Sequence, residues 1–446
     1  MFRRKTTFVL LLITVMALTG FVLGGGSLLG KTDAGDNGHY ATIKTFAETL
    51  SIVKQNYVEE VNEKELVYGA IKGMLNSLDP HSSFMPPEAF KEMQIDTKGE
   101  FSGLGIQIGI KDKMLTVIAP IDDTPAYKAG IKAGDKILKI DGELTRDITL
   151  QDAVTKLRGP KGTSVIITVL REGWEQPKDF VLVREVILLK SVKSRTLDDR
   201  IGYIKLTQFQ QKTASDLGDA LEKLKKDNIN ALVLDLRNNP GGLLNGAVEV
   251  TSKFLPEGKL VVFIKGRSGD KQEFHTVNDG HFDSPMVVLV NEGSASASEI
   301  VAGALQDWGR AVVLGMQTFG KGSVQTVIPL TDGSALRLTT ARYYTPKGRS
   351  IQTTGITPDI VAKAEIKGNS QAHPVLREKD LKQHLKNDVS REKEKEMEKD
   401  IRPEEGGEPE MTETPAEISE AEDIQLQRAL DLLKTWKIFR ELPKAG

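Results

Sequence analysis

The chain has 446 residues, of which 39% are hydrophobic and 27% charged, a globular composition with room for about three domains. The 60 Lys and Arg are balanced by 62 Asp and Glu, which argues against a protein built mainly to hold nucleic acid. The absence of cysteine excludes disulfides, cysteine nucleophiles and thiolate metal sites. The histidines have no spacing typical of a metal site, so we expect no metal and no other cofactor.

The first thirty residues indicate export. Basic residues at positions 3–5 precede an uncharged stretch, residues 6–30, that is apolar for most of its length. This pattern is typical of a secretory signal or of a membrane anchor whose N-terminus is cytoplasmic. Because no clear cleavage site precedes Lys31, we favour an anchor over a cleaved signal peptide 1–30. The rest of the chain is then expected in the periplasm or on the extracytoplasmic side of the cytoplasmic membrane.

The next two regions differ in their apolar pattern. Residues 39–94 have apolar side chains three and four positions apart and are predicted to be helical. Residues 95–185 contain short alternating stretches typical of strands. One helix is expected in this second region, because Thr149 followed by Asp152 forms a capping box before an apolar stripe that ends at Leu157.

Residues 186–365 alternate between predicted strands and helices. The strands are nearly continuous apolar runs, which favours an α/β layer covered on both faces. The predicted strands are 201–206, 231–236, 260–265 and 286–291, and the helices are about 212–226, 244–254 and 297–308. Residues 366–422 are predicted to be a charged linker. The last segment, 423–442, is an amphipathic helix that must dock somewhere to bury its apolar face.

Residues 291–299, NEGSASASE, follow a buried strand and precede a helix. A serine at such a turn lies beside the unpaired N–H groups of the helix, which is the arrangement that a serine nucleophile with an oxyanion hole needs. Ser296 followed by Glu299 is also a capping box. The segment alone therefore leaves a purely structural interpretation open.

A serine nucleophile needs a base, and no histidine lies in a comparable turn. Lys321 lies in TFGKGSVQ, residues 318–325, which reads as a loop running into a strand. Residues four apart on a strand share a face, so Gln325 is expected to point the same way and to hold the amine. A basic lysine must be neutral, and burial can lower its pKa of about 10.4 by the roughly three units required. The alternative is a surface lysine in a glycine turn.

Two glycine-rich patterns need separate interpretations. Residues 235–242, DLRNNPGG, follow a buried strand, and Gly241 and Gly242 would let backbone N–H groups approach a substrate oxygen. An ordinary tight turn is the alternative. Nucleotide binding is not expected, because Gly322 stands where a phosphate loop needs Ser or Thr, and Ile108 stands where a dinucleotide fingerprint needs glycine.

Taken together, six segments resemble the carboxy-terminal processing peptidases, the tail-specific serine peptidases of family S41, which use a Ser–Lys dyad. The segments are LDPHSSFM (78–85), SGLGI (102–106), AGIKAGDKILKIDG (129–142), DLRNNPGG (235–242), VNEGSASASEIVAGALQD (290–307) and TFGKGSVQ (318–325). The resemblance implies an α/β fold: a Clp/crotonase-like peptidase core over residues 186–365, an inserted PDZ domain over residues 95–185, and helical N- and C-terminal segments.

The resemblance also assigns roles to the candidate residues. It implies that Ser296 is the nucleophile, that Lys321 is the general base and that Gln325 orients the lysine. The oxyanion hole is expected to use the N–H of Ala297 and one N–H from the turn at residues 241–242, with Gly241 and Gly242 both open. The implied function is an exported endopeptidase. The alternative is an exported PDZ scaffold with an inactive core, which would be expected to lack one of the three catalytic side chains.

In PDZ modules, a glycine-rich loop receives the C-terminal carboxylate of a peptide, which adds as a strand to an exposed edge. Here that loop corresponds to Gly103, Leu104, Gly105 and Ile106. The expected partners are therefore protein or peptide substrates bound by their C-termini. Arg158, just after the predicted PDZ helix, is a candidate link between the bound peptide and the active site; the alternative is an ordinary surface arginine. The family further implies a homodimer formed by the terminal helices, and an adaptor protein in some members.

Overall fold

The computed structural model describes residues 36–277, 281–363, 376–387 and 423–441. The predicted anchor, residues 6–30, lies outside them, as does most of the predicted linker 366–422. Within the described ranges, no helix is both long enough and apolar enough to cross a membrane. The chain divides into two compact units, residues 1–73 and 74–446.

The described part of the first unit is helical. It contains α2 (Asp36–Asn56) and most of α3 (Glu63–Asn76), the latter continuing into the second unit. The end of α2 is joined to the start of α3 by an ion pair of 2.5 Å between Lys54 and Glu63. Apolar side chains on α2 remain exposed, Ile43 by 67% and Ile52 by 61%.

The first strand of the second unit is one that the helical pattern of residues 39–94 did not predict. β1 (Ser83–Met85) follows the segment at Asp79 and is only three residues long. Helix α4 (Pro87–Lys98) follows, with proline in its first turn and a left-handed Gly99 at its end.

Strands β2 (Glu100–Gly103) and β9 (Glu185–Leu188) pair with each other and enclose a smaller module. Its sheet has the order β3-β4-β5-β7-β8, with β6 beside β5. The bounds are β3 Ile106–Lys111, β4 Met114–Pro120, β5 Lys136–Ile140, β6 Glu143–Leu144, β7 Ser164–Leu170 and β8 Lys178–Val183. The module also contains α5 (Pro125–Lys128) and α6 (Leu150–Leu157). The N-cap of α6 is Thr149, as predicted, and its hydroxyl accepts a hydrogen bond of 3.1 Å from the N–H of Asp152.

Among the described residues, the largest hydrophobic core is built around a six-stranded sheet of order β10-β11-β12-β15-β16-β19. All neighbours in this sheet are parallel except β10 and β11. The bounds are β10 Val192–Leu197, β11 Ile201–Leu206, β12 Ala231–Asp235, β15 Met286–Val290, β16 Val312–Gly315 and β19 Ile360–Val361. The short 3-10 helix η1 (Asp198–Arg200) connects β10 to β11.

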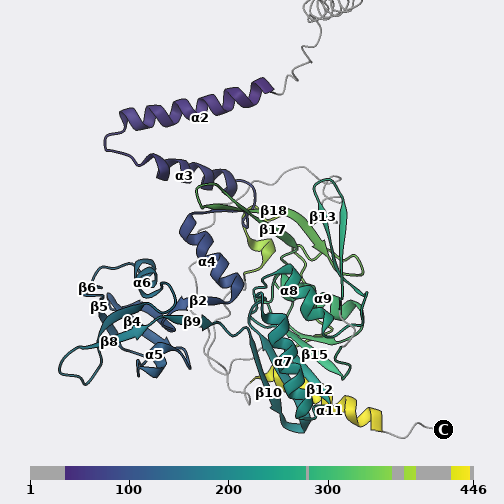
Figure 1. The fold of residues 1–446 in the computed structure, drawn as a ribbon. Coiled ribbons are helices and arrows are strands. Elements are labelled where there is room, and N and C mark those ends of the chain that lie inside the picture. Colours follow the sequence, from purple (N-terminus) through teal and green to yellow (C-terminus); the bar gives the residue numbers. More distant parts are fainter. Residues whose placement is uncertain (1–35, 278–280, 364–375, 388–422, 442–446) are drawn as a thin grey trace, which may run out of the picture. The chain divides into compact units, whose positions relative to one another are not determined.

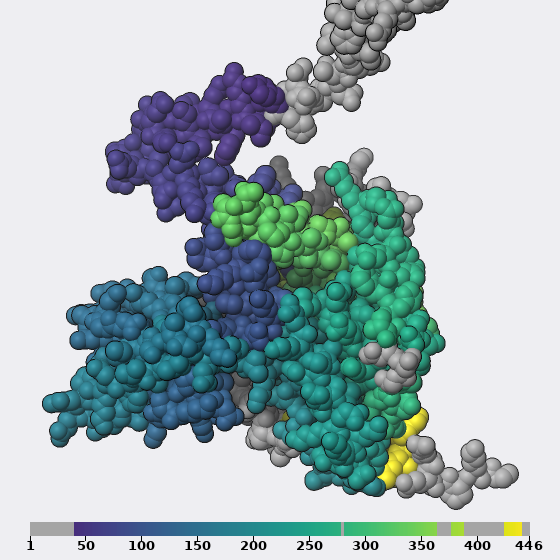
Figure 2. All heavy atoms as spheres, in the orientation of Figure 1, coloured from purple at the N-terminus to yellow at the C-terminus, as the bar shows by residue number. Residues whose placement is uncertain are grey.

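Helices cover both faces of this sheet (Figure 1). On one face lie α7 (Thr213–Lys226), α8 (Leu244–Ser252) and α9 (Ala297–Asp307), close to the predicted bounds. On the other face lies α11 (Ile424–Glu441), which buries Leu426, Ala429 and Leu433 against the strands. Only part of α11 is visible on the face drawn in Figure 2. The C-terminal helix therefore docks on its own chain and not, as predicted, on a second subunit.

A second, antiparallel sheet has the order β1-β18-β13-β14, with β17 also paired to β18. Its other strands are β13 Leu260–Gly266, β14 Lys271–His275, β17 Ser323–Pro329 and β18 Ala335–Tyr344. The apolar run at residues 260–265, predicted as a strand of the α/β layer, belongs to this sheet. The prediction was wrong because an apolar run indicates burial but does not identify the neighbouring strands.

Candidate active site

Ser296 lies at the turn between β15 and α9, as predicted. Its backbone has φ 55° and ψ −113°, a conformation that costs a residue with a side chain about 1–3 kcal/mol. The hydroxyls of Ser294 and Ser298 are buried and donate to the carbonyl oxygens of Leu236 and Asn239, at 2.8 and 2.9 Å. Ser296 is only partly buried. Strain and access together distinguish Ser296 from the other serines of the run.

The glycine turn after β12 packs directly against Ser296. A Cβ atom on Gly241, which has φ 103°, would lie 2.8 Å from the Cβ of Ser296 and 2.9 Å from the N of Ala297. The N–H of Gly241 donates to Oδ1 of Asn239 at 2.9 Å, so this amide already has a partner. The predicted oxyanion residues are thus brought together, and Gly241 has no room for a side chain.

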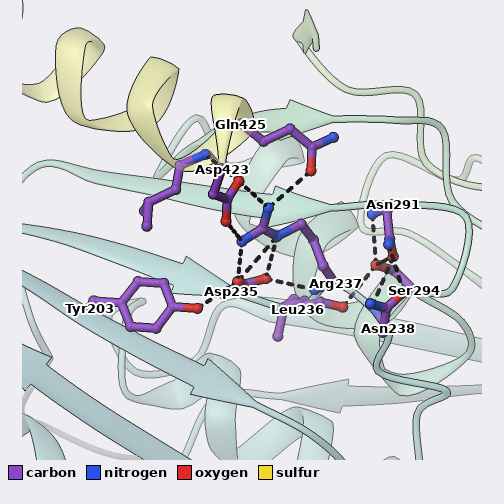
Figure 3. A network of polar contacts seen from close by, with 10 residues as sticks. Tyr203, Asp235, Leu236, Arg237, Asn238, Asn291, Ser294, Asp423 and Gln425 are labelled. Carbon is purple, nitrogen blue, oxygen red and sulfur yellow. Dashed lines mark hydrogen bonds and ion pairs between the residues drawn. The ribbon is translucent and has the colours of Figure 1, made fainter. Parts of the chain in front are cut away.

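Arg237 holds the start of this glycine turn in a buried polar network (Figure 3). Its guanidinium contacts the carboxylate of Asp235 at 2.6 Å and that of Asp423, just before α11, at 2.7 Å. The hydroxyl of Tyr203 also donates to Asp235, at 2.7 Å. Burial opposes the charged guanidinium, but the hydrogen bonds to Asp423 and Asp235 raise the pKa of Arg237 above its usual value. The network therefore joins the C-terminal helix to the loop that carries Gly241.

Glu299, in the first turn of α9, joins the serine turn to the lysine loop. Its fully buried carboxylate accepts the N–H of Ser296 at 2.8 Å and that of Lys321 at 3.0 Å. It also accepts the N–H of Gly320 at 2.8 Å and the hydroxyl of Thr318 at 2.5 Å. Burial raises the pKa of Glu299 to about 7, although these hydrogen bonds act in the opposite direction. The predicted capping box of Ser296 and Glu299 is present. The same Glu299 carboxylate also binds the backbone of the lysine loop.

Lys321 lies in the loop before β17, which begins at Ser323. Burial lowers the pKa of Lys321, and the positive charge of Arg337 lowers it further. The carboxylates of Glu378, Glu299 and Asp79 act against this shift. Lys321 is therefore not the surface lysine of the alternative interpretation, and its surroundings shift it toward the neutral amine that a base requires.

Gln325 is anchored through its side-chain nitrogen. The amide donates to the hydroxyl of Ser323 at 3.0 Å and to that of Thr339 at 3.2 Å. Ser323 and Gln325 share a face of β17. Lys321 lies before this strand begins, so the alternation of side chains along a strand does not place the lysine on the same face as Gln325. The predicted bond from Gln325 to Lys321 stays a prediction.

Tyr343 of β18, which no sequence motif indicated, also lies beside the site, and its aromatic side chain is almost fully buried in the core. Its N–H donates to the carbonyl oxygen of Gly322 at 2.9 Å, which ties β18 to the lysine loop. Burial raises the pKa of Tyr343 well above its ordinary value. The phenol is therefore protonated at neutral pH and is not the base that Ser296 needs.

A small apolar groove lies in the module between its edge strand β3 and helix α6. The cavity measures about 60 Å³ and is lined by Phe101, Leu104, Gly105, Ile106, Ile108, Val154, Leu157 and Arg158. Three of the four residues of the predicted carboxylate loop are among these. Arg158 is paired with Glu92 of α4 at 2.6 Å and lies over the ring of Phe101, 4.6 Å from its centre. It therefore connects the groove to α4.

Comparisons with known proteins agree on one family. The model for peptidase family S41 matches residues 200–362, a PDZ domain model matches residues 116–171, and a model for the N-terminal domain of the activating protease CtpB matches residues 27–89.

Two curated relatives and one solved structure give the extent of the likeness. A carboxy-terminal-processing protease of Bartonella bacilliformis is 48% identical over 353 residues, which is 78% of this chain and 81% of that protein. The carboxy-terminal processing protease CtpA of Bacillus subtilis is 37% identical over 82% of this chain and 78% of its own length. The structure of a photosystem II D1 C-terminal processing protease is 31% identical, covers 71% of this chain and 92% of that one, and has a TM-score of 0.42.

Proposed function

We propose that this chain, which belongs to peptidase family S41 and is a serine-type carboxy-terminal processing peptidase with a PDZ domain, cleaves through an acyl-enzyme on Ser296. Lys321 is the general base. The observation that carries the proposal is the buried carboxylate of Glu299, which binds the backbone of both residues, at 2.8 Å and 3.0 Å. The strained, accessible Ser296 and the lowered pKa of Lys321 support it.

The chemical steps follow from these positions. The neutral amine of Lys321 takes the proton from the Ser296 hydroxyl as its oxygen attacks the scissile carbonyl. The C–N bond then breaks, and the lysine returns the proton to the leaving amine. Water, deprotonated by the same amine, then attacks the ester. As the bond between the acyl carbon and Oγ breaks, the lysine returns that proton to Oγ, which regenerates Ser296 and the neutral amine.

The oxyanion formed in each attack is held by backbone donors. Ala297 is the first residue of α9. Its N–H points outward from the first turn, as the N-terminal amides of a helix do. Because the N–H of Gly241 donates to Asn239, Gly242 is the better candidate for the second donor. Losing one such donor typically costs about 10²–10³-fold in rate.

The dyad is tested by replacing each partner separately. We expect Ser296→Ala and Lys321→Ala to abolish cleavage of an unfolded protein that ends in small apolar residues, with the thermal unfolding transition retained. Lys226→Ala, at the exposed C-terminal end of α7, is the control and should cleave normally. A Lys321→Ala enzyme that cuts at the wild-type rate would falsify the assignment of the base.

The PDZ groove supports recognition of substrate C-termini. β3 is an edge strand of its sheet, so a peptide can add to it while its carboxylate meets the loop at residues 103–106. Export, anchoring by residues 6–30, a homodimer and an adaptor protein also belong to this proposal. Export rests on the apolar N-terminal stretch alone, and finding the chain in the cytoplasmic fraction after cell fractionation would contradict it.

A further inference from the structure

We propose that Glu378 is a positioning residue for the general base: its buried carboxylate, held between His81 and Gln352, fixes the backbone beside Lys321. The inference rests on the proposed role of Lys321. It gives a function to a residue that follows the matched peptidase domain, residues 200–362, and to the LDPHSSFM segment, whose role the catalytic mechanism leaves unexplained.

Glu378 belongs to a strap segment, residues 376–387, which contains the short 3-10 helix η2 (Glu378–Asp380). This segment lies against the lysine loop. The N–H of Glu378 donates to the carbonyl oxygen of Phe319 at 3.3 Å, and the guanidinium of Arg377 donates to that of Thr318 at 3.3 Å. Part of the predicted charged linker is thus packed against the catalytic region.

The Glu378 side chain completes a chain of hydrogen bonds that ends next to Lys321. One carboxylate oxygen lies 2.7 Å from Nε2 of His81. The other accepts the side-chain amide of Gln352 at 2.8 Å, and the oxygen of that amide accepts the N–H of Gly322 at 2.9 Å. Glu378 and Gln352 are both 0% exposed. Because Gly322 follows Lys321 directly, moving Glu378 would move the backbone of the base.

The LDPHSSFM segment reaches the same loop by a second route. The Asp79 carboxylate accepts the hydroxyls of Ser82, at 2.6 Å, and Thr339, at 3.1 Å. Thr339 in turn accepts the side-chain amide of Gln325 at 3.2 Å. Burial opposes ionisation of Asp79, but its hydrogen bonds prevail and lower its pKa. One segment therefore supports both Gln325 and, through His81 and Glu378, the backbone at Gly322.

Glu378 also contributes to the electric field at the lysine. The charged groups that act on Lys321 are Arg337 of β18, Glu299 of α9, Asp79 and Glu378, and His81 contacts the last of these. A negative charge at Glu378 favours the protonated amine. Removing that charge while keeping the shape should make Lys321 easier to deprotonate, an effect that a purely structural residue would not have.

Two variants of the full-length chain separate position from charge. Glu378→Gln keeps the length of the side chain, so we expect the acidic limb of the kcat/KM profile against pH to move to lower pH. Glu378→Asp keeps the charge but cannot span both partners. We expect its kcat to fall by about 10- to 100-fold, as is typical of a slightly misplaced group, with the acidic limb unmoved. Either variant tests the proposal if the other does not fold.

The matched control is Lys379→Ala, an exposed neighbour on the same short helix, which should leave both kcat and the pH profile unchanged. Wild-type kcat in Glu378→Asp together with an unmoved limb in Glu378→Gln would overturn the proposal. Lys321→Ala is measured in parallel. If Lys321→Ala cleaves normally, the proposed base is wrong, whereas if it is inactive and both Glu378 variants behave as wild type, only the role of Glu378 is wrong.

Discussion

Glu299 shows how one side chain can set the distance between two loops that are far apart in sequence. Its carboxylate binds the N–H groups of Ser296 and Lys321, and both bonds are to backbone rather than to the reacting atoms. The strained backbone of Ser296 needs such support, because its conformation is unfavourable in isolation. We therefore regard Glu299 as a positioning residue whose removal affects geometry first.

The raised pKa of Glu299 predicts a pH-dependent stability. A carboxyl whose pKa is about 7 in the folded chain, against about 4.3 when unfolded, binds its proton more tightly in the folded state. Folding stability from this group is therefore lost as pH rises from about 4 to about 7. In Glu299→Gln that loss is absent, so the free energy of unfolding, measured by denaturant titration, should fall less steeply than in wild type between about pH 4 and about pH 7.

The same variant should also lower activity, because an amide nitrogen cannot accept the backbone N–H groups that the carboxylate accepts. We expect kcat to fall by about 10- to 100-fold. Glu292→Gln, a partly exposed carboxylate in the preceding turn, is the control for both measurements. Parallel pH curves for Glu299→Gln and wild type would show that Glu299 does not titrate in this range.

At the scale of secondary structure, α11 supports the glycine turn from the opposite face of the sheet. Asp423 and Gln425 meet the Arg237 guanidinium at 2.7 and 3.1 Å (Figure 3). Burial opposes ionisation of Asp423, but its bonds to Arg237 hold its pKa below the ordinary value. This contribution to stability is present at neutral pH and is lost as pH falls below the ordinary aspartate pKa, about 3.9.

We therefore predict that Asp423→Ala weakens the docking of α11. Breaking a hydrogen bond to a charged group costs about 1.5–3 kcal/mol, and the free energy of unfolding should drop by about that amount. Hydrogen exchange should increase in α11 and in the turn at residues 235–242. Asp431→Asn, an exposed position on the same helix, should change neither. If hydrogen exchange at residues 235–242 is unchanged in Asp423→Ala, the docking of α11 does not stabilise the glycine turn of the site.

The sequence predicted elements better than it predicted their partners. Periodicity and caps located α7, α8 and α9, because these signals are local. The apolar pattern of residues 260–265 predicted a strand but assigned it to the wrong sheet, because strand pairing depends on residues that are distant in the sequence. Glu299 and Glu378 act through contacts with residues that are distant in the sequence. Glu299 contacts Lys321, 22 positions away, and Glu378 contacts His81, 297 positions away. Only the capping box gave a local signal for Glu299, and the charged surroundings of Glu378 suggested a linker.

Across the molecule, Arg158 is the residue through which we expect peptide binding to reach the active site. Arg158 lines the PDZ groove and bonds Glu92 of α4. Helix α4 follows β1, which pairs with β18, and β18 carries Thr339 and Arg337 beside the lysine loop. A peptide carboxylate entering the groove would compete with Glu92 for Arg158. This contact therefore gives the groove a physical route to Lys321.

This route predicts that peptides with a free C-terminus stimulate cleavage and that Arg158→Ala removes the stimulation. A peptide of the same sequence with an amidated C-terminus should stimulate less, because it lacks the charge that competes for Arg158. Lys156→Ala is the matched control, since Lys156 is exposed on the same helix and pairs with Glu143 inside the module. Rates of cleavage are measured with and without each peptide. If Arg158→Ala has the same basal rate and the same stimulated rate as wild type, peptide binding acts on the active site by another route.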